Sequence, residues 1–335
     1  MASRRGVSIR ISFAMTLVLI AAILVAVLPV QMVDAARVQL PDQSGPYKVG
    51  YYKTTYQMPP YGTYRAVIRY PAKYNRYRAP SDTSGGPYPG IVVSNGLFGS
   101  EWQITWIAKH LASHGYVTIC FTPPRVIYFD ATQWAYGFNG GIEKLKAENA
   151  ARYSKIKGIL DTTRFGVIGL SMGGAGCLEA TGTNPEIDAA VPLAPAVPPR
   201  DMFDYLYADV RAAVQNIKVP TQIQAGSNDA MVRPELAAQY YSLMPDTTPK
   251  EFVEIKGANH VGFIDDFYAR VAAFLRLDKP NDIGFEAQRR VSSRYFTAWF
   301  QYWLKGLSGY STYIFGQEAQ KDLKSGVLSD LKCNL

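Results

Sequence analysis

The sequence has few of the residues that bind metals or form disulfide frameworks. Its 335 residues include only three histidines and three cysteines. Three cysteines cannot form a disulfide framework, and no Cys/His cluster has the spacing of a metal site. We find no phosphate-binding or dinucleotide-binding loop and no internal repeat. We therefore expect chemistry without a metal or cofactor, carried out by the protein's own side chains.

Charge of one sign is concentrated at only one place. The formal net charge is +8, and the basic residues are scattered except for a cluster formed by Arg65, Arg69, Lys73, Arg76 and Arg78. No nucleic-acid motif accompanies this cluster, so solubility or attraction to an anionic surface explains the charge better than nucleic-acid recognition. We expect a monomer with no nucleic-acid partner.

The most informative motif is a glycine-flanked serine. Residues 164–176 read RFGVIGLSMGGAG, an apolar run followed by a turn and a small-residue helix, with Ser171 at the turn. Gly169 and Gly173 stand where a sharp strand-to-helix turn leaves no room for a side chain. G-x-S-x-G can occur by chance in a chain with 28 glycines, but the flanking strand and helix patterns favour a nucleophile elbow.

A serine hydroxyl needs a neighbouring base, and in the chain order Ser, acid, His that base follows the nucleophile. His110 and His114 precede Ser171 and lie four residues apart on an amphipathic helix, where solvent-facing or helix-ending roles are expected. His260 remains, in a loop after the alternating strand pattern of residues 251–256. We predict that His260 is the base, the alternative being a loop histidine with no task.

Several carboxylates lie between Ser171 and His260. Asp229 is preferred because it follows a strand pattern (residues 219–225) and a Gly-Ser-Asn turn. Ligand sites in open α/β sheets lie beyond the carboxyl ends of the strands, so a carboxylate at this position is well placed. Asn-Asp is also an ordinary turn dipeptide, and Asp204 is the reserve candidate.

The oxyanion of an acyl-transfer reaction needs two backbone N–H donors. One is expected from Met172, directly after the nucleophile. The other is expected after the strand pattern of residues 89–94, from Leu97, with Phe98 as the next candidate.

The remaining chain predicts one α/β domain with a mostly parallel, twisted sheet covered by helices on both faces. The first expected strand, at residues 63–70, belongs to an early hairpin. Further strands are expected at residues 90–94, 115–121, 165–169, 189–193, 221–225 and 252–255. Helical spacing of Val291, Tyr295, Phe296, Trp299, Phe300 and Trp303 predicts a packing face. Cys120 and Cys177 are expected to be buried, whereas Cys333 is either free or paired with an unidentified partner.

The first 35 residues predict an export signal. Three arginines precede an apolar stretch from Ile11 to Val30, and Val33-Asp-Ala35 offers small residues for cleavage. The apolar stretch is also long enough to span a bilayer uncut. We expect a secreted or extracellular protein whose domain covers residues 36–335, with a membrane anchor as the alternative if the leader is not cleaved.

Several motifs in order resemble the secreted bacterial cutinases and polyester hydrolases, close to the dienelactone-hydrolase-like and chlorophyllase-like branches. They include Arg65-Ala-Val-Ile-Arg-Tyr-Pro71, Pro89-Gly-Ile-Val-Val-Ser94, Gly166-Val-Ile-Gly-Leu-Ser-Met-Gly-Gly174, Asn228-Asp229 and Gly257-Ala-Asn-His260. The resemblance implies an α/β-hydrolase fold with a Ser171, Asp229, His260 triad and the amides of Leu97 and Met172 as oxyanion donors.

The departures from that pattern concern the substrate. Leu97 stands where these polyester hydrolases usually carry an aromatic residue, Ala196 stands where they usually carry a tryptophan, and Cys333 lacks an obvious partner for the usual C-terminal disulfide. The sequence thus predicts a less aromatic cleft, with Trp134 or Phe129 as replacements, and residues 199–218 or 263–285 bordering its mouth. Substrate contacts are expected from Phe98, Ala196, Met231, Val261 and Trp134.

The expected function is a secreted serine carboxylic-ester hydrolase that works through an acyl-enzyme. Its expected partner is an ester substrate, either a small molecule or a polymer, and polyesters such as poly(ethylene terephthalate) are candidates. The alternatives are a lipase-like or lactone hydrolase on the same triad, a peptidase, and a catalytically silent envelope-binding protein.

Overall fold

A computed structural model describes residues 39–196 and 210–335, and residues 39–335 form one compact unit. The predicted leader, the reserve acid Asp204 and the first half of the segment 199–218 lie outside the described residues. Within the described ranges, no helix is both long and apolar enough to cross a membrane. The leader and the domain boundary at residue 36 therefore stay predictions.

A nine-stranded sheet in the order β1-β2-β4-β3-β5-β6-β7-β8-β9 organises this unit. Its strands are β1 (Lys48–Met58), β2 (Gly62–Ala72), β3 (Tyr88–Ser94), β4 (Val117–Thr122), β5 (Leu160–Leu170), β6 (Ala189–Leu193), β7 (Thr221–Gly226), β8 (Lys250–Ile255) and β9 (Leu328–Asn334). The pairs β1–β2, β2–β4 and β8–β9 are antiparallel, and the others are parallel. The predicted mostly parallel sheet is confirmed.

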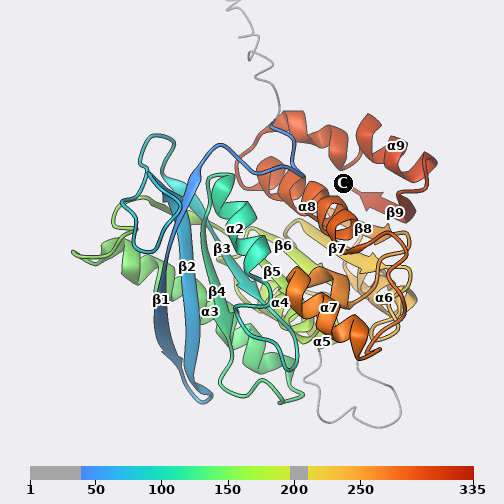
Figure 1. Cartoon of the computed structure of the whole chain (residues 1–335), viewed down its shortest axis with the longest axis horizontal. Helices are drawn as coiled ribbons and strands as arrows, with labels where there is room; N and C mark the ends of the chain where they lie inside the picture. Colours follow the sequence, from blue (N-terminus) through green and yellow to red (C-terminus); the bar gives the residue numbers. More distant parts are fainter. Residues whose placement is uncertain (1–38, 197–209) are drawn as a thin grey trace, which may run out of the picture. The chain divides into compact units, whose positions relative to one another are not determined.

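Helices cover both faces of the sheet. They are α2 (Thr105–Ser113), α3 (Ala131–Ala150), α4 (Met172–Thr183), α5 (Val210–Val214), α6 (Pro234–Leu243), α7 (Asp266–Phe274), α8 (Phe285–Trp303) and α9 (Gln317–Lys324), with short 3₁₀ turns η1 (Val261–Phe263) and η2 (Ser308–Tyr313). Figure 1 shows α2 and α8 in front of the sheet and α3 and α4 behind it. The central strands are therefore buried on both sides, as their apolar sequences require.

All seven predicted strands form, with small differences in their ends. β4 begins at Val117 rather than residue 115, because Gly115 adopts a φ of +83° in the turn after α2. The edge strands β1 and β9 have no predicted bounds. Both are rich in polar residues and alternate poorly, and their pairing partners rather than their own sequences define them.

The aromatic stripe on α8 forms the predicted packing face. Tyr295, Phe296, Trp299 and Phe300 are fully buried, and α8 packs against β6, β7 and β8. Cys120 in β4 and Cys177 in α4 are buried, as predicted, and Cys333 in β9 is free and exposed. Of the two alternatives left open for Cys333, the structure shows the free thiol.

His110 and His114, the two histidines that precede Ser171, were expected to face solvent or to end a helix. A solvent-facing role is wrong for His114, which is 3% exposed and caps the end of α2. Its Nε2 lies 2.8 Å from the Gln43 carbonyl oxygen, and His110 Nε2 lies 2.9 Å from the Pro41 carbonyl oxygen. Burial lowers the pKa of His110 to about 4 and that of His114 to about 3. Both are neutral structural residues that bind the N-terminal segment.

Candidate active site

Ser171 lies in a strained turn between β5 and α4. Its φ of +58° is rare for a residue with a side chain, and its backbone N–H donates to Leu193 O at 2.9 Å. A Cβ on Gly169 would collide with the Gly173 carbonyl, and one on Gly173 would collide with the Asn95 carbonyl. The predicted requirement for both glycines is confirmed, and the turn lifts Ser171 to the edge of the sheet where the strands end.

The predicted acid and base follow two neighbouring parallel strands. Asp229 lies just after β7 and His260 just after β8, so both reach the same edge of the sheet. His260 Nδ1 lies 2.7 Å from Asp229 Oδ2, and both residues are at least 95% buried. Asp229 Oδ1 accepts hydrogen bonds from the N–H groups of Met231 and Val232. The carboxylate is thereby fixed and can orient the imidazole.

The charges around His260 favour its protonated form. Burial alone would lower the pKa of the imidazole, but the charge and hydrogen bond of Asp229, together with the charge of Asp278, raise this pKa above its usual value. His260 and Ser171 line the same cleft. No hydrogen bond joins Ser171 Oγ to the imidazole among the described residues, and such bonds often tighten only when substrate is bound.

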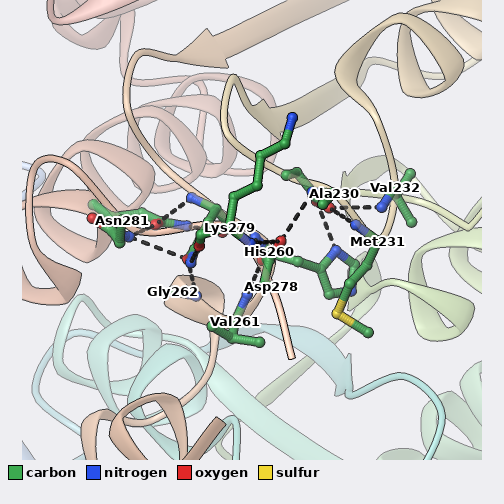
Figure 2. Close-up of polar contacts among 12 residues, drawn as sticks. Ala230, Met231, Val232, His260, Val261, Gly262, Asp278, Lys279 and Asn281 are labelled. Carbon is green, nitrogen blue, oxygen red and sulfur yellow. Dashed lines mark hydrogen bonds and ion pairs between the residues drawn. The ribbon is translucent and has the colours of Figure 1, made fainter. Parts of the chain in front are cut away.

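Asp278 contacts the candidate site, and sequence reasoning missed it. Figure 2 shows its carboxylate between the loops that carry the acid and the base. Oδ2 accepts from the N–H of His260 at 2.6 Å and of Val261 at 3.3 Å, and Oδ1 accepts from Ala230 N–H at 2.9 Å. Asp278 therefore holds both catalytic loops through their backbone. In the sequence, Asp278 is followed by Lys-Pro, and this local pattern does not indicate which N–H groups the carboxylate accepts from.

The histidine loop is also tied to α8. Gln288 Nε2 donates to the Asn259 carbonyl at 2.7 Å, and Gln288 Oε1 accepts from the Asn259 N–H at 3.1 Å. The Asn259 side chain accepts from Gly262 N–H and donates to the Lys279 carbonyl. This two-sided bonding fixes the backbone on either side of His260, so the imidazole sits on a rigid support.

We expect Asp278→Asn to move the acidic limb of the pH–rate profile to lower pH. His260 must be neutral to accept a proton, so activity rises with pH through its pKa. The charge of Asp278 raises that pKa, and its removal lowers it. Asparagine keeps one acceptor oxygen, so the alkaline plateau should fall by no more than about tenfold, the size of one hydrogen bond. The measurement is kcat/KM for a soluble ester from pH 5 to 9.

The matched control is Asp282→Asn, which removes a nearby carboxylate that bonds Asn228. Its pH profile should coincide with that of the unaltered protein. An acidic limb that stays in place in Asp278→Asn would contradict the electrostatic role, and a flat profile between pH 5 and 8 in the unaltered protein would argue against His260 as the base.

Two backbone donors are available for an oxyanion. Among the described residues, the N–H groups of Leu97 and Met172 have no hydrogen-bond acceptor. Met172 is the first residue of α4, where the helix leaves its N–H groups unpaired and favours negative charge. Phe98 is not a donor, because its N–H donates to Val126 O at 2.8 Å. Of the two residues predicted for the β3 loop, the geometry therefore favours Leu97.

A cleft of about 460 Å³ surrounds Ser171 and His260. Of the predicted substrate contacts, Phe98, Met231 and Val261 line it, as does Leu97. Phe129, predicted as a replacement ring, also lines the cleft. The rest of the wall was not predicted as substrate contacts and comprises Asn95, Gly96, Gly99, Gln103, Leu170, Ile264, Tyr268, Val271, Ala272, Leu275 and Leu277. The segment 263–285 thus borders the cleft as predicted, and the part of 199–218 that is described does not line it.

Trp134 and Ala196 do not reach the cleft. The Trp134 indole is fully buried, and its Nε1 donates to Asn95 O at 2.7 Å, so it supports the oxyanion loop from below. Its predicted role as a substrate contact is wrong. Ala196 instead donates its N–H to Ser171 O at 2.9 Å and steadies the elbow.

Aromatic rings nevertheless line the cleft. Phe98, Phe129 and Tyr268 supply them, and Phe98 is 68% exposed with a φ of +58°. The cleft is thus more aromatic than Leu97 and Ala196 alone predict, and Phe129 serves as the replacement ring. Sequence spacing could not show this, because the three rings come from three separate loops and helices.

Comparison with known proteins gives consistent matches. A family described as "PETase: PET hydrolase-like" matches residues 59–333. Cutinase est2 of Thermobifida alba is 27% identical over 195 residues, which is 58% of this chain and 56% of that protein. The bis(hydroxyethyl) terephthalate hydrolase of Streptomyces coelicolor is 28% identical over 183 residues, 54% of this chain and 53% of that protein. The chain thus spans just over half the length of these relatives, and the matches agree with the resemblance inferred from the motifs.

Proposed function

The chain belongs to the PET hydrolase-like family, and from this membership and the geometry of its cleft we propose that it is a cutinase-like serine carboxylic-ester hydrolase with an α/β-hydrolase fold. The observation that carries the proposal is the ordered contact of His260 with Asp229 in the cleft that also holds Ser171. This combination suits acyl transfer, because it supplies a nucleophile, a base and an orienting carboxylate.

The proposed reaction proceeds through an acyl-enzyme. His260 Nε2 takes the proton of Ser171 Oγ as this oxygen attacks the ester carbonyl, and the N–H groups of Leu97 and Met172 donate to the resulting oxyanion. The imidazolium then protonates the leaving alcohol, and the acyl group remains on Ser171. Water, deprotonated by His260, releases the acid and restores the serine. Asp229 keeps Nδ1 protonated throughout, so Nε2 is free to accept.

The proposed substrates are esters with extended apolar or aromatic acyl groups, polyesters included. The rings of Phe98, Phe129 and Tyr268 can stack on an aromatic acid. Val271, Leu275 and Leu277 form an aliphatic wall, which supports an acyl-lipid ester as a second candidate. We propose that the protein works outside the cell, which the leader-like N-terminus supports, with cell-surface anchoring as the alternative.

A panel of substrates tests the proposed function. We expect turnover of 4-nitrophenyl butyrate and bis(hydroxyethyl) terephthalate, and little turnover of the matched anilide or of a lactone. A serine-directed phosphonate should add to one peptide only, the one that contains Ser171, as read by mass spectrometry. Labelling elsewhere, or none, would contradict the proposal and favour a catalytically silent binding protein. A rate that increases with acyl-chain length would favour the acyl-lipid candidate.

Exposed rings on α7 predict a difference between soluble and solid substrates. Phe267 is 71% exposed and Phe274 is 86% exposed, and neither lines the cleft that α7 borders. We expect the double variant Phe267→Ser/Phe274→Ser to release product from a polyester film at least about tenfold more slowly. The reason is that covering one such ring contributes about 1.5–3 kcal/mol to adsorption. Its kcat/KM for 4-nitrophenyl butyrate should change less than about twofold.

The matched control is Tyr153→Ser, which removes a ring that is 80% exposed in the loop between α3 and β5. This loop precedes β5 and thus lies at the edge of the sheet opposite Ser171. The control should degrade the film at the unaltered rate. Equal losses on film and soluble ester in the α7 variant would show that α7 acts through the cleft and not through adsorption.

A further inference from the structure

A second cavity is lined by residues of β1, β2 and α2 and of nearby loops. These three elements are labelled in Figure 1. Its volume is about 660 Å³, and it shares no lining residue with the catalytic cleft. Three basic side chains line it, Lys53 from β1, Arg69 from β2 and Lys109 from α2. No aspartate or glutamate is among its described lining residues. The cavity is therefore a concentrated positive site.

Arg69 is a buried cation in the wall of this cavity. Its side chain is only 5% exposed, and its Nη2 donates to Thr105 Oγ1 at 3.1 Å. In the described part of the chain, its Nη1 has no hydrogen-bond partner and no carboxylate forms an ion pair with it. Burial lowers the pKa of Arg69, while the charges of Asp265 and Glu101 act in the opposite direction. A buried guanidinium with an unpartnered donor is costly, and an anion in the cavity would offset that cost.

Aromatic rings accompany the cations. Lys53 Nζ lies 5.2 Å from the centre of the Trp102 ring, and the Arg69 guanidinium lies 6.0 Å from that of Tyr51. Tyr77 packs edge-on against Tyr51, with ring centres 5.6 Å apart. Trp102 is 38% and Tyr77 51% exposed, so both keep free ring surface. A ligand here meets apolar faces as well as positive charge.

We propose that this cavity binds an aromatic carboxylate, with the carboxylate toward Arg69, Lys53 and Lys109 and the ring against Trp102 and Tyr77. The planar guanidinium matches a carboxylate, and a cavity of this size holds one or two aromatic rings. The choice of acid rests on the proposed function, because hydrolysis of an aromatic ester releases such an acid. The site can take that acid from the protein's own reaction or from the surroundings.

Binding of benzoate to the full chain carrying Ser171→Ala tests the site without turnover. By isothermal titration, we expect benzoate to bind at least tenfold more tightly than benzamide, its neutral counterpart, and more tightly than sulfate. Affinity should fall as salt is added, because exposed cations contribute. Lys53→Met/Lys109→Met should weaken benzoate binding at least tenfold, and Arg69→Gln should do the same wherever its thermal unfolding shows an intact fold. The control Lys48→Met, a β1 lysine outside the cavity, should bind within twofold of the parent.

The same double variant with Ser171 intact should hydrolyse 4-nitrophenyl butyrate within twofold of the unaltered protein. Equal affinity for benzoate and benzamide, or a double variant that binds like Lys48→Met, overturns the proposal. The proposal is also overturned if the cavity substitutions leave the benzoate affinity unchanged and benzoate competes with the ester, because this outcome places the acid in the catalytic cleft. Benzoate binding with the expected variant pattern but no ester turnover supports the site, contradicts the proposed function and identifies the surroundings as the source of the acid.

Discussion

Replacing Ser171 with alanine is expected to lower kcat for 4-nitrophenyl butyrate by about 10⁴-fold or more, with the melting temperature unchanged within about 2 °C. In the proposed reaction the Ser171 hydroxyl forms the acyl-enzyme, so its removal should stop turnover. Among the described residues, Ser171 Oγ makes no hydrogen bond whose loss would destabilise the fold. Alanine also keeps the backbone turn at φ +58°.

The measurement needs protein purified apart from any active enzyme, because a trace of contamination imitates residual activity. The phosphonate-labelled fraction of the unaltered protein gives the concentration of active sites against which rates are compared. A variant that keeps a tenth of the activity would contradict the assignment of Ser171 as nucleophile. A melting temperature that falls by many degrees would show instead that the hydroxyl supports the elbow.

Asp229→Asn should have the second largest effect, a fall of about 10⁴-fold in kcat near neutral pH. The asparagine oxygen can still accept from the N–H groups of Met231 and Val232, so the loop keeps its shape. The new amide donates to His260 Nδ1, however, which moves the ring proton to Nε2. The base then has no lone pair facing Ser171.

Asp278→Asn is the matched comparison, since it makes the same chemical change on a carboxylate that contacts the backbone of the same loop. Initial rates at pH 8 should rank the unaltered protein first, Asp278→Asn within about tenfold of it and Asp229→Asn far below. Similar losses in the two variants would contradict the separate roles given to these carboxylates.

The residues that we propose as catalytic were predictable because each depends on a local pattern. Gly169 and Gly173 flank Ser171 in one recognisable five-residue motif, although the atom that a Cβ on Gly173 would meet belongs to Asn95. Asp229 and His260 each follow a readable strand, and parallel strands bring their ends to one edge. The shortage of histidines left little choice of base.

The remaining features depend on contacts between distant segments. Asp278 follows His260 by 18 residues, and its contacts with this loop are hydrogen bonds from backbone N–H groups. Trp134 is predicted to replace a ring that the resemblance leads one to expect in the cleft, yet its indole N–H donates to the Asn95 carbonyl inside the core. His114 looks solvent-facing on an isolated helix until the N-terminal segment covers it. No periodicity within one helix or strand carries this information.

The position of helix α7 affects how the substrate specificity of this protein can evolve. It supplies Tyr268, Val271 and Ala272 to the cleft, but none of the residues that we propose form or stabilise the acyl-enzyme. Mutations on its cleft-facing side can therefore alter which acid fits while the triad loops, braced by Asp278 and Gln288, stay as they are. Selection for a new ester can act on one helix, and a random library confined to residues 266–277 is the efficient place to search for altered specificity.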